Sequence, residues 1–226
     1  MKFTYYGHSC FAVELNQKKL LFDPFISPNP LAKEIDIDKI KPDYILITHA
    51  HGDHIADAEQ IAKKSGAPII SSFEVCNWFQ KKEITKLHPL GLGGKKTFDF
   101  GTVKYVSALH SSSFPDGSYG GNPGGFIITS PGGNFYYAGD TALTLDMQLI
   151  PSYAEIGFAV LPIGDNFTVG YEDAVEITKL VKTKKVIGVH YNTFDLIKID
   201  TGKAQEYFLK NGFTLLLPAI GETIDV

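Results

Sequence analysis

The chain lacks most of the features that mark secreted and membrane-spanning proteins. It has only two cysteines, Cys10 and Cys76, which lie far apart in sequence and form no CxxC pair. We therefore expect two free thiols in a reducing compartment and no disulfide. No apolar run approaches the roughly 20 residues of a membrane span, and residues 1–6 resemble a strand more than a signal peptide. From these absences we expect a cytoplasmic protein with no membrane partner.

Concentrated positive charge is absent as well. The formal net charge is −4 at pH 7, and no long basic run occurs. A nucleic-acid-binding surface needs such charge, so we expect no nucleic-acid partner. The 226 residues, of which 44% are hydrophobic, are enough for one sizeable core. We expect a single domain over residues 1–226.

The most informative stretch that is present lies between a predicted strand and a predicted helix. Residues 44–47 are apolar and largely β-branched, which predicts a buried strand. Residues 55–64 have apolar positions at helical spacing, which predicts a helix. Between these two segments stands the run Thr48-His49-Ala50-His51-Gly52-Asp53-His54.

The spacing within this run indicates metal binding. His49 and His51 are two residues apart, so an extended backbone directs both imidazoles to the same side, where they can hold one cation. Asp53 and His54 stand where the helix begins and leave in another direction, which suits a second cation. Two such divalent ions generate hydroxide at neutral pH. The alternative for Asp53 is that it only caps the helix.

Other residues of metal-binding type stand at the ends of further predicted strands. The strands 44–48, 103–109, 134–138 and 185–189 end at or beside His49, His110, Asp140 and His190. Ligands in layered α/β folds gather at the carboxyl ends of strands. We therefore predict that these four residues meet in one site. The Ser-, Gly- and Pro-rich segment 111–125 is predicted to be a mobile loop that could cover it.

The order His-x-His-x-Asp-His, a lone His, Gly-Asp and a final His resembles the metallo-β-lactamase superfamily over nearly the whole chain. Local stretches resemble more closely a group of uncharacterised metal-dependent hydrolases related to L-ascorbate-6-phosphate lactonase. These stretches are Gly7-His8-Ser9, Phe22-Asp23-Pro24, His110-Ser111-Ser112-Ser113, Gly139-Asp140-Thr141, residues 162–168 and residues 190–194.

The resemblance implies an α/β fold, a four-layer αββα sandwich of two mixed sheets. It assigns one divalent ion to His49, His51 and His110, a second ion to Asp53, His54 and His190, and a bridging role to Asp140. We expect zinc, although manganese and iron accept the same ligands. The implied chemistry is hydrolysis of a small ester, lactone or phosphoester. A hydroxide held between the metals attacks the carbonyl or phosphorus centre, and Asp53 helps to orient or deprotonate it.

His8 is the further histidine for which we predict a function. It lies in the sequence Tyr6-Gly7-His8-Ser9-Cys10, where Gly7 permits a tight backbone turn between two β segments. The lactonase-like proteins that the sequence resembles place this histidine beside the metals. We predict that His8, as neutral or protonated imidazole, donates a hydrogen bond or proton to the oxyanion or the leaving group. The alternative is a hydrogen-bonded loop histidine.

Several alternatives stay open or are disfavoured by the residues. Flavodiiron-type oxygen reductases would carry Glu in place of His51 and need a flavin domain. Glyoxalase-type thioesterases add a helical domain, and tRNA-processing enzymes add an arm or a basic surface. A phosphodiesterase or nuclease of the same fold and a non-catalytic metal-binding sensor remain alternative functions. The chain could also form a homo-oligomer. Asp23 either orients the metal loop or forms a turn with Pro24.

Overall fold

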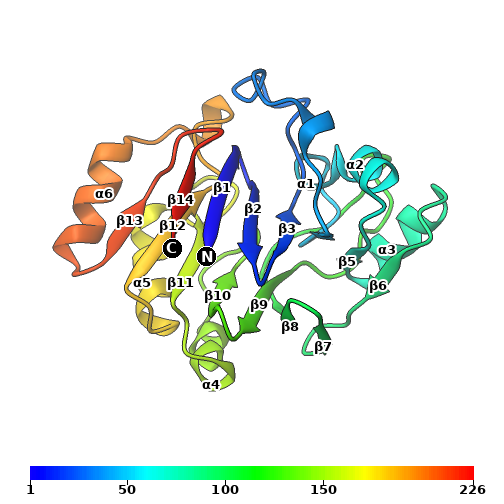
Figure 1. Ribbon diagram of the computed structural model, residues 1–226. Coiled ribbons are helices and arrows are strands. Elements are labelled where there is room, and N and C mark those ends of the chain that lie inside the picture. Colours follow the sequence, from blue (N-terminus) through cyan, green and yellow to red (C-terminus); the bar gives the residue numbers. More distant parts are fainter.

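Two seven-stranded sheets pack face to face in the computed structural model, which describes all residues 1–226 (Figure 1). The first sheet has the spatial order β14-β1-β2-β3-β4-β5-β6. Its strands are antiparallel from β1 to β3 and parallel from β3 to β6. Their bounds are Thr223–Asp225 (β14), Lys2–Gly7 (β1), Cys10–Leu15 (β2), Lys18–Phe22 (β3), Tyr44–Leu46 (β4), Ile69–Ser71 (β5) and Leu87–Pro89 (β6).

The second sheet has the order β13-β12-β11-β10-β9-β8-β7 and is mixed in the same way. It is antiparallel from β7 to β10 and parallel from β10 to β13. Its strands are Thr214–Leu216 (β13), Lys185–Val189 (β12), Phe158–Pro162 (β11), Gly133–Tyr137 (β10), Gly124–Ser130 (β9), Gly101–Ser107 (β8) and Lys95–Phe98 (β7).

Most strands have apolar residues at successive positions. Since side chains alternate along a strand, both faces of each sheet are then apolar. Phe11 and Phe22 point into the space between the sheets and stack with ring centroids 4.6 Å apart. Tyr137 of the opposite sheet meets both rings edge-on. The neighbouring residues Ala12 and Leu21 face outward and pack under helices. A central apolar layer and two outer apolar layers result, as expected for an αββα sandwich.

Helices cover the outer face of each sheet (Figure 1). The first sheet packs against α2 and α3, and the second against η2, α4, α5 and α6. None of these helices has the length and apolar character that crossing a membrane requires. The helical segments are η1 (Ile37–Lys39), α1 (Gly52–Ile55), α2 (Ala58–Ser65), α3 (Phe73–Gln80), η2 (Leu145–Leu149), α4 (Ile150–Tyr153), α5 (Tyr171–Leu180), η3 (Asp195–Ile197) and α6 (Thr201–Lys210).

The predicted helix over 55–64 is wrong in one respect, because the structure divides it into α1 and α2. The break lies at Asp57, which is buried. Its Oδ2 accepts hydrogen bonds from the backbone N–H groups of Ile26 at 2.6 Å and Ser27 at 2.9 Å. The carboxylate therefore serves the preceding loop, and the chain turns there. The strand predicted at 103–109 also differs, since β8 ends at Ser107.

Candidate metal centre

The eight predicted site residues lie together at one edge of the sandwich. The strands β1, β4, β8, β10 and β12 each precede at least one of them. The pairing pattern makes β1 and β4 run in the same direction in the first sheet, and β8, β10 and β12 in the second. The loops of the two sheets also meet directly, since the backbone N–H of His190 donates to the carbonyl oxygen of His8 at 2.9 Å.

A first group of potential ligands consists of His49, His51 and His110, whose ring nitrogens lie within 4.8 Å of one another. The Nε2 of His49 is 2.9 Å from the Nδ1 of His51. Two imidazoles on a tetrahedral zinc ion have their nitrogens roughly 3.3 Å apart, given Zn–N bonds of about 2.0–2.1 Å. The three rings therefore have nearly the spacing of a zinc site, and they are the set that the resemblance assigns to one ion.

A second group contains Asp53, His54 and His190, together with His8. The Oδ2 of Asp53 is 3.0 Å from the Nε2 of His8, 3.8 Å from that of His190 and 3.9 Å from that of His54. The structure thus brings His8 to the same carboxylate as the two ligands predicted for the second ion. The role of His8, as ligand or as catalytic group, stays a prediction.

Asp140 lies between the two groups. Its Oδ2 is 3.1 Å from the Nε2 of His190, 3.2 Å from that of His54 and 3.7 Å from that of His110. His190 and His54 belong to the second group and His110 to the first, so one carboxylate reaches both. This is the position that the bridging role requires.

Three buried polar atoms in the cluster have no hydrogen-bond partner, namely His54 Nε2, His190 Nδ1 and Asp140 Oδ1. Buried polar atoms are rarely left unpaired, because each costs the free energy of its lost hydration. Imidazole nitrogens and a carboxylate oxygen are also the ligand types that zinc accepts. Both the ligand types in the cluster and its unpaired buried atoms are therefore consistent with a site for divalent ions.

One residue outside the predicted ligands organises the cluster. Asp23 follows β3 and is fully buried. Its Oδ1 accepts from the backbone N–H of Thr48 at 2.8 Å. Its Oδ2 accepts from the Thr48 hydroxyl at 2.7 Å, from Nδ1 of His54 at 2.9 Å and from the Tyr137 hydroxyl at 2.6 Å. Of the two predicted roles for Asp23, orientation of the metal loop is therefore the one with direct contacts.

These hydrogen bonds also determine which imidazole nitrogen faces the cluster. Because Asp23 accepts the proton of His54 Nδ1, the lone pair of the neutral ring is on Nε2, next to Asp140. The Thr48 hydroxyl gives its proton to Asp23, so its oxygen accepts from Nδ1 of His49 at 3.0 Å. In the neutral form of each ring the lone pair is therefore on Nε2, and this is the form that binds a metal ion.

Charge in the cluster follows from burial and from the mixture of rings and carboxylates. Burial lowers the pKa of His49 well below its usual value. Burial acts the same way on His54, but Asp140, Asp53 and Asp23 together raise the pKa of that ring. Burial would raise the pKa of Asp140, yet His190 and His54 hold it well below its usual range. Asp140 is therefore an ionised acceptor.

His8 is 1% exposed and uses both ring nitrogens. Nε2 contacts Asp53 at 3.0 Å, and Nδ1 lies 3.0 Å from the Thr193 hydroxyl. Burial, partly opposed by the hydrogen bond to Asp53, lowers the pKa of His8 to about 4. The neutral ring then donates from Nε2 to Asp53, and its Nδ1 accepts from the Thr193 hydroxyl, whose other acceptor, the carbonyl oxygen of Tyr191, is farther away at 3.4 Å. Of the two protonation states that the sequence left open, the structure favours the neutral one.

Sequence reasoning missed Tyr137 and Thr193. Tyr137 stands on the inner face of β10 among aromatic core residues, and no spacing distinguishes it from them. Thr193 lies in the stretch 190–194 that carries the family resemblance, but its hydroxyl has no distinctive pattern in sequence. Only the fold brings these hydroxyls to Asp23 and His8.

Comparison with known proteins agrees with this geometry. The family profile described as the β-lactamase superfamily domain matches residues 2–190. The chain belongs to the metallo-β-lactamase superfamily. Among superfamily members, it is 51% identical over 227 residues to a UPF0173 metal-dependent hydrolase of Christiangramia forsetii, with 100% of both chains covered. A protein of the same name from Flavobacterium johnsoniae is 50% identical over 226 residues, again with full coverage of both chains.

A solved structure shows the same superfamily fold. Igni18, described as a novel metallo hydrolase from the archaeon Ignicoccus hospitalis, superposes with a TM-score of 0.88 at 35% identity. The match covers 99% of this chain and 97% of Igni18. These relatives confirm the predicted family and the αββα sandwich. Within the superfamily, the chain belongs with the metal-dependent hydrolases.

Proposed function

We propose that this chain holds two divalent ions, zinc in the first place, and hydrolyses a small ester, lactone or phosphoester. The observation that carries the proposal is the position of Asp140, whose carboxylate contacts rings of both ligand groups. Two ligand groups that share one carboxylate would hold two cations side by side. When bound, such ions supply Lewis acidity and a water molecule with a pKa near neutral.

The exposed side of the cluster indicates where a substrate arrives. His51, Asp53 and His110 are half-buried, whereas His49, His54 and His190 are buried. The side chain of Asp53 is 29% exposed, against 3% for Asp140. Asp53 is therefore the carboxylate that an incoming molecule and its attacking water can reach. We assign to it the orientation or deprotonation of that water.

His8 contacts Asp53 from the buried side of the cluster. Its neutral ring donates to the Oδ2 of Asp53, so that oxygen is held while the other oxygen of the carboxylate stays available. A hydrogen bond from a fixed donor also keeps Asp53 ionised, which a proton acceptor requires. We therefore assign His8 a positioning role in catalysis, which it exerts through Asp53.

Metal content and turnover should be measured together. The protein is loaded with zinc, manganese or iron, its ions are counted by elemental analysis, and esters, lactones and phosphodiesters are screened. We expect two ions per chain and turnover that depends on them. His110→Ala should weaken one ion more than the other, and His190→Ala should do the reverse.

The chain offers a matched control for these variants. Six of its seven histidines lie in the ligand groups, and the seventh, His88, lies in β6 outside them. His88→Ala should keep both ions and full turnover. One ion or none in well-loaded wild-type protein contradicts the dinuclear site. Two ions without turnover of any ester, lactone or phosphodiester supports the metal-binding sensor instead.

A further inference from the structure

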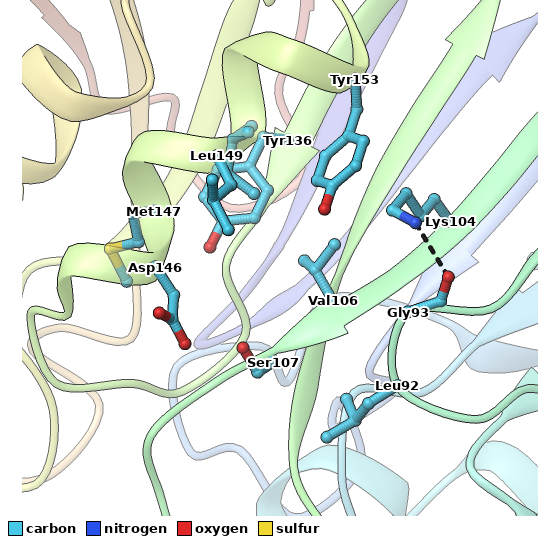
Figure 2. A pocket seen from close by; sticks show the side chains of 11 residues that line it. Leu92, Gly93, Lys104, Val106, Ser107, Tyr136, Asp146, Met147, Leu149 and Tyr153 are labelled. Carbon is cyan, nitrogen blue, oxygen red and sulfur yellow. Dashed lines mark hydrogen bonds between the residues drawn. The ribbon is translucent and has the colours of Figure 1, made fainter.

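A cavity lies on the outer side of the second sheet, and none of the metal-ligand candidates line it. It has a volume of about 320 Å³ and is bounded by β8, β10 and the segment η2–α4 (Figure 2). Apolar side chains make up most of its wall, among them Val106, Met147 and Leu149. Cavities of this size with an apolar wall and a few polar groups are typical small-molecule sites.

The hydroxyl of Tyr136 makes no hydrogen bond, although this residue is only 1% exposed and reaches the wall of the cavity (Figure 2). Other buried tyrosines do make one. Tyr5 donates to the carbonyl oxygen of His8, Tyr105 to that of Thr48, and Tyr137 to Asp23. The Tyr136 oxygen is not fully enclosed by the protein, so the hydroxyl is open to the cavity. Tyr136 is thus a donor that lacks an acceptor within the chain.

Two further polar groups of the wall are also free of protein partners. Ser107 and Asp146 are both exposed, and neither the Ser107 hydroxyl nor the Asp146 carboxylate makes a hydrogen bond or an ion pair within the chain. The cationic group is engaged, because Lys104 donates to the carbonyl oxygen of Gly93 at 2.8 Å and lies 4.3 Å from the ring centroid of Tyr153. The free groups therefore comprise hydroxyls and one negative charge.

We propose that this cavity binds a small uncharged molecule with an apolar ring and a primary amide group. The amide oxygen would accept from Tyr136, and the amide N–H would donate to Asp146. The ring would take the apolar wall formed by Val106, Met147 and Leu149. A carboxylate in place of the amide would face the unpaired charge of Asp146, so anions of the same shape should be rejected.

The site would be separate from the proposed hydrolytic centre but would lie next to the segments that lead to it. β8 ends at Ser107 shortly before His110, and Asp146 lies in η2, which follows the loop that contains Asp140. The two segments are joined by a hydrogen bond from Ala142 N–H to the carbonyl oxygen of Leu109 at 2.9 Å. Because no ligand candidate lines the cavity, the bound molecule should not displace a metal ion or compete with a substrate.

Benzamide and benzoate have the same shape and test this proposal directly. Binding to the metal-loaded full chain is followed by backbone NMR shifts. We expect saturable binding of benzamide, with shifts at residues of β8, β10 and η2, and no binding of benzoate. Tyr136→Phe should weaken benzamide binding about fivefold, the effect of one neutral hydrogen bond. Asp146→Asn should let benzoate bind as well.

A stability comparison separates a ligand-binding hydroxyl from a structural one. Tyr136→Phe removes an unpaired group, so the melting temperature of the free protein should not fall. Tyr137→Phe, the matched control, removes the bond to Asp23, and its melting temperature should fall.

Other results would overturn the proposal. These are no saturable benzamide binding, equal binding of benzoate to the wild type, or a Tyr136→Phe variant that binds benzamide unchanged. The exposed Leu149 at the rim provides a further test. If the protein is a dimer that Leu149→Lys converts to a monomer, a second copy covers the cavity and the proposal fails.

Discussion

At the scale of single residues, Asp23 orients the histidine rings of the metal cluster. It is fully buried and accepts hydrogen bonds from Thr48, His54 and Tyr137. A carboxylate in this position can only accept, so it keeps a proton on Nδ1 of His54 and makes Nε2 the nitrogen that is free in the neutral ring. The sequence allowed this role but could not separate it from a turn, because an Asp before Pro24 fits both. The deciding contacts come from distant parts of the chain.

Replacing this carboxylate by an amide tests its role. We expect Asp23→Asn to lower metal affinity about 10- to 100-fold, the usual effect of losing a partner that orients a metal-binding histidine. The amide NH₂ group cannot accept from His54, so the ring loses its fixed orientation. Metal affinity is measured by competition with a chelator of known affinity.

Asp99→Asn is a suitable control for this experiment. Asp99 is exposed and accepts from Tyr44 far from the cluster, so its variant should keep wild-type affinity. Unchanged metal affinity in Asp23→Asn would show that Asp23 acts only in the local turn.

His8 permits a second prediction at this scale. Its backbone has a φ of 53°, in the left-handed region, so Asn is a better-tolerated replacement than Ala. We expect His8→Asn to keep the fold and both ions, because the predicted metal set is complete without it. The value of kcat should fall about 10²- to 10⁴-fold, since Asp53 loses its donor.

The pH profile of this variant provides the distinguishing measurement. Burial lowers the pKa of His8 to about 4, so the ring stays neutral from there upward. The profile of the variant should therefore keep its shape above pH 5 while its height falls. A lost ion would instead identify His8 as a ligand, and an unchanged kcat would make it a loop histidine.

At the scale of elements, the sequence predicted the strands that carry ligands better than the segments between them. The strands around 44–47, 134–138 and 185–189 are confirmed within about a residue at each end, because they are short, apolar and buried on both faces. η2 and α4 were not predicted. Nor was β14, which has only half-buried and exposed residues and forms by pairing with β1 at the other end of the chain.

The loop after β8 illustrates a further limit of sequence reasoning. Its Ser, Gly and Pro content predicts mobility, but Phe114 stacks on Trp78 of α3 with ring centroids 4.2 Å apart. The Ser112 hydroxyl accepts from the backbone N–H of Ala50, within the metal motif. Composition alone does not reveal an anchor of this kind, because the aromatic partner lies on another element.

The stack suggests a third prediction. Trp78→Ala should release Phe114, displace the loop from the mouth of the cluster and lower kcat/KM about tenfold for small substrates. Metal content should not change, because no ligand candidate contacts Trp78. Trp78→Phe retains an aromatic surface and should keep most of the activity. If both variants behave like the wild type, the position of the loop does not matter for turnover.

At the scale of the whole molecule, the metal ions should contribute to stability. The cluster gathers six imidazoles and two carboxylates and leaves buried atoms unpaired, so ions that bind only the folded chain should stabilise it. An ion present at about 100 times its Kd adds roughly 2.7 kcal/mol to the free energy of unfolding. For a chain of this size we expect removal by a chelator to lower Tm by about 5–10 °C per site.

Readdition experiments identify the cause of such a loss. Zinc should restore Tm, whereas magnesium should not, because magnesium prefers oxygen ligands. A protein shown by elemental analysis to have lost its ions, yet with an unchanged Tm, would contradict this prediction.

The wide distribution of the ligand candidates along the chain also has a consequence for folding kinetics. They extend from His8 to His190, and the two sheets contribute them jointly. The site is therefore complete only after the sheets have docked, which is a late event for contacts of such high sequence separation. Ions that bind at this stage should leave the refolding rate nearly unchanged and slow unfolding. The metals would then contribute chiefly to the kinetic stability of the native state.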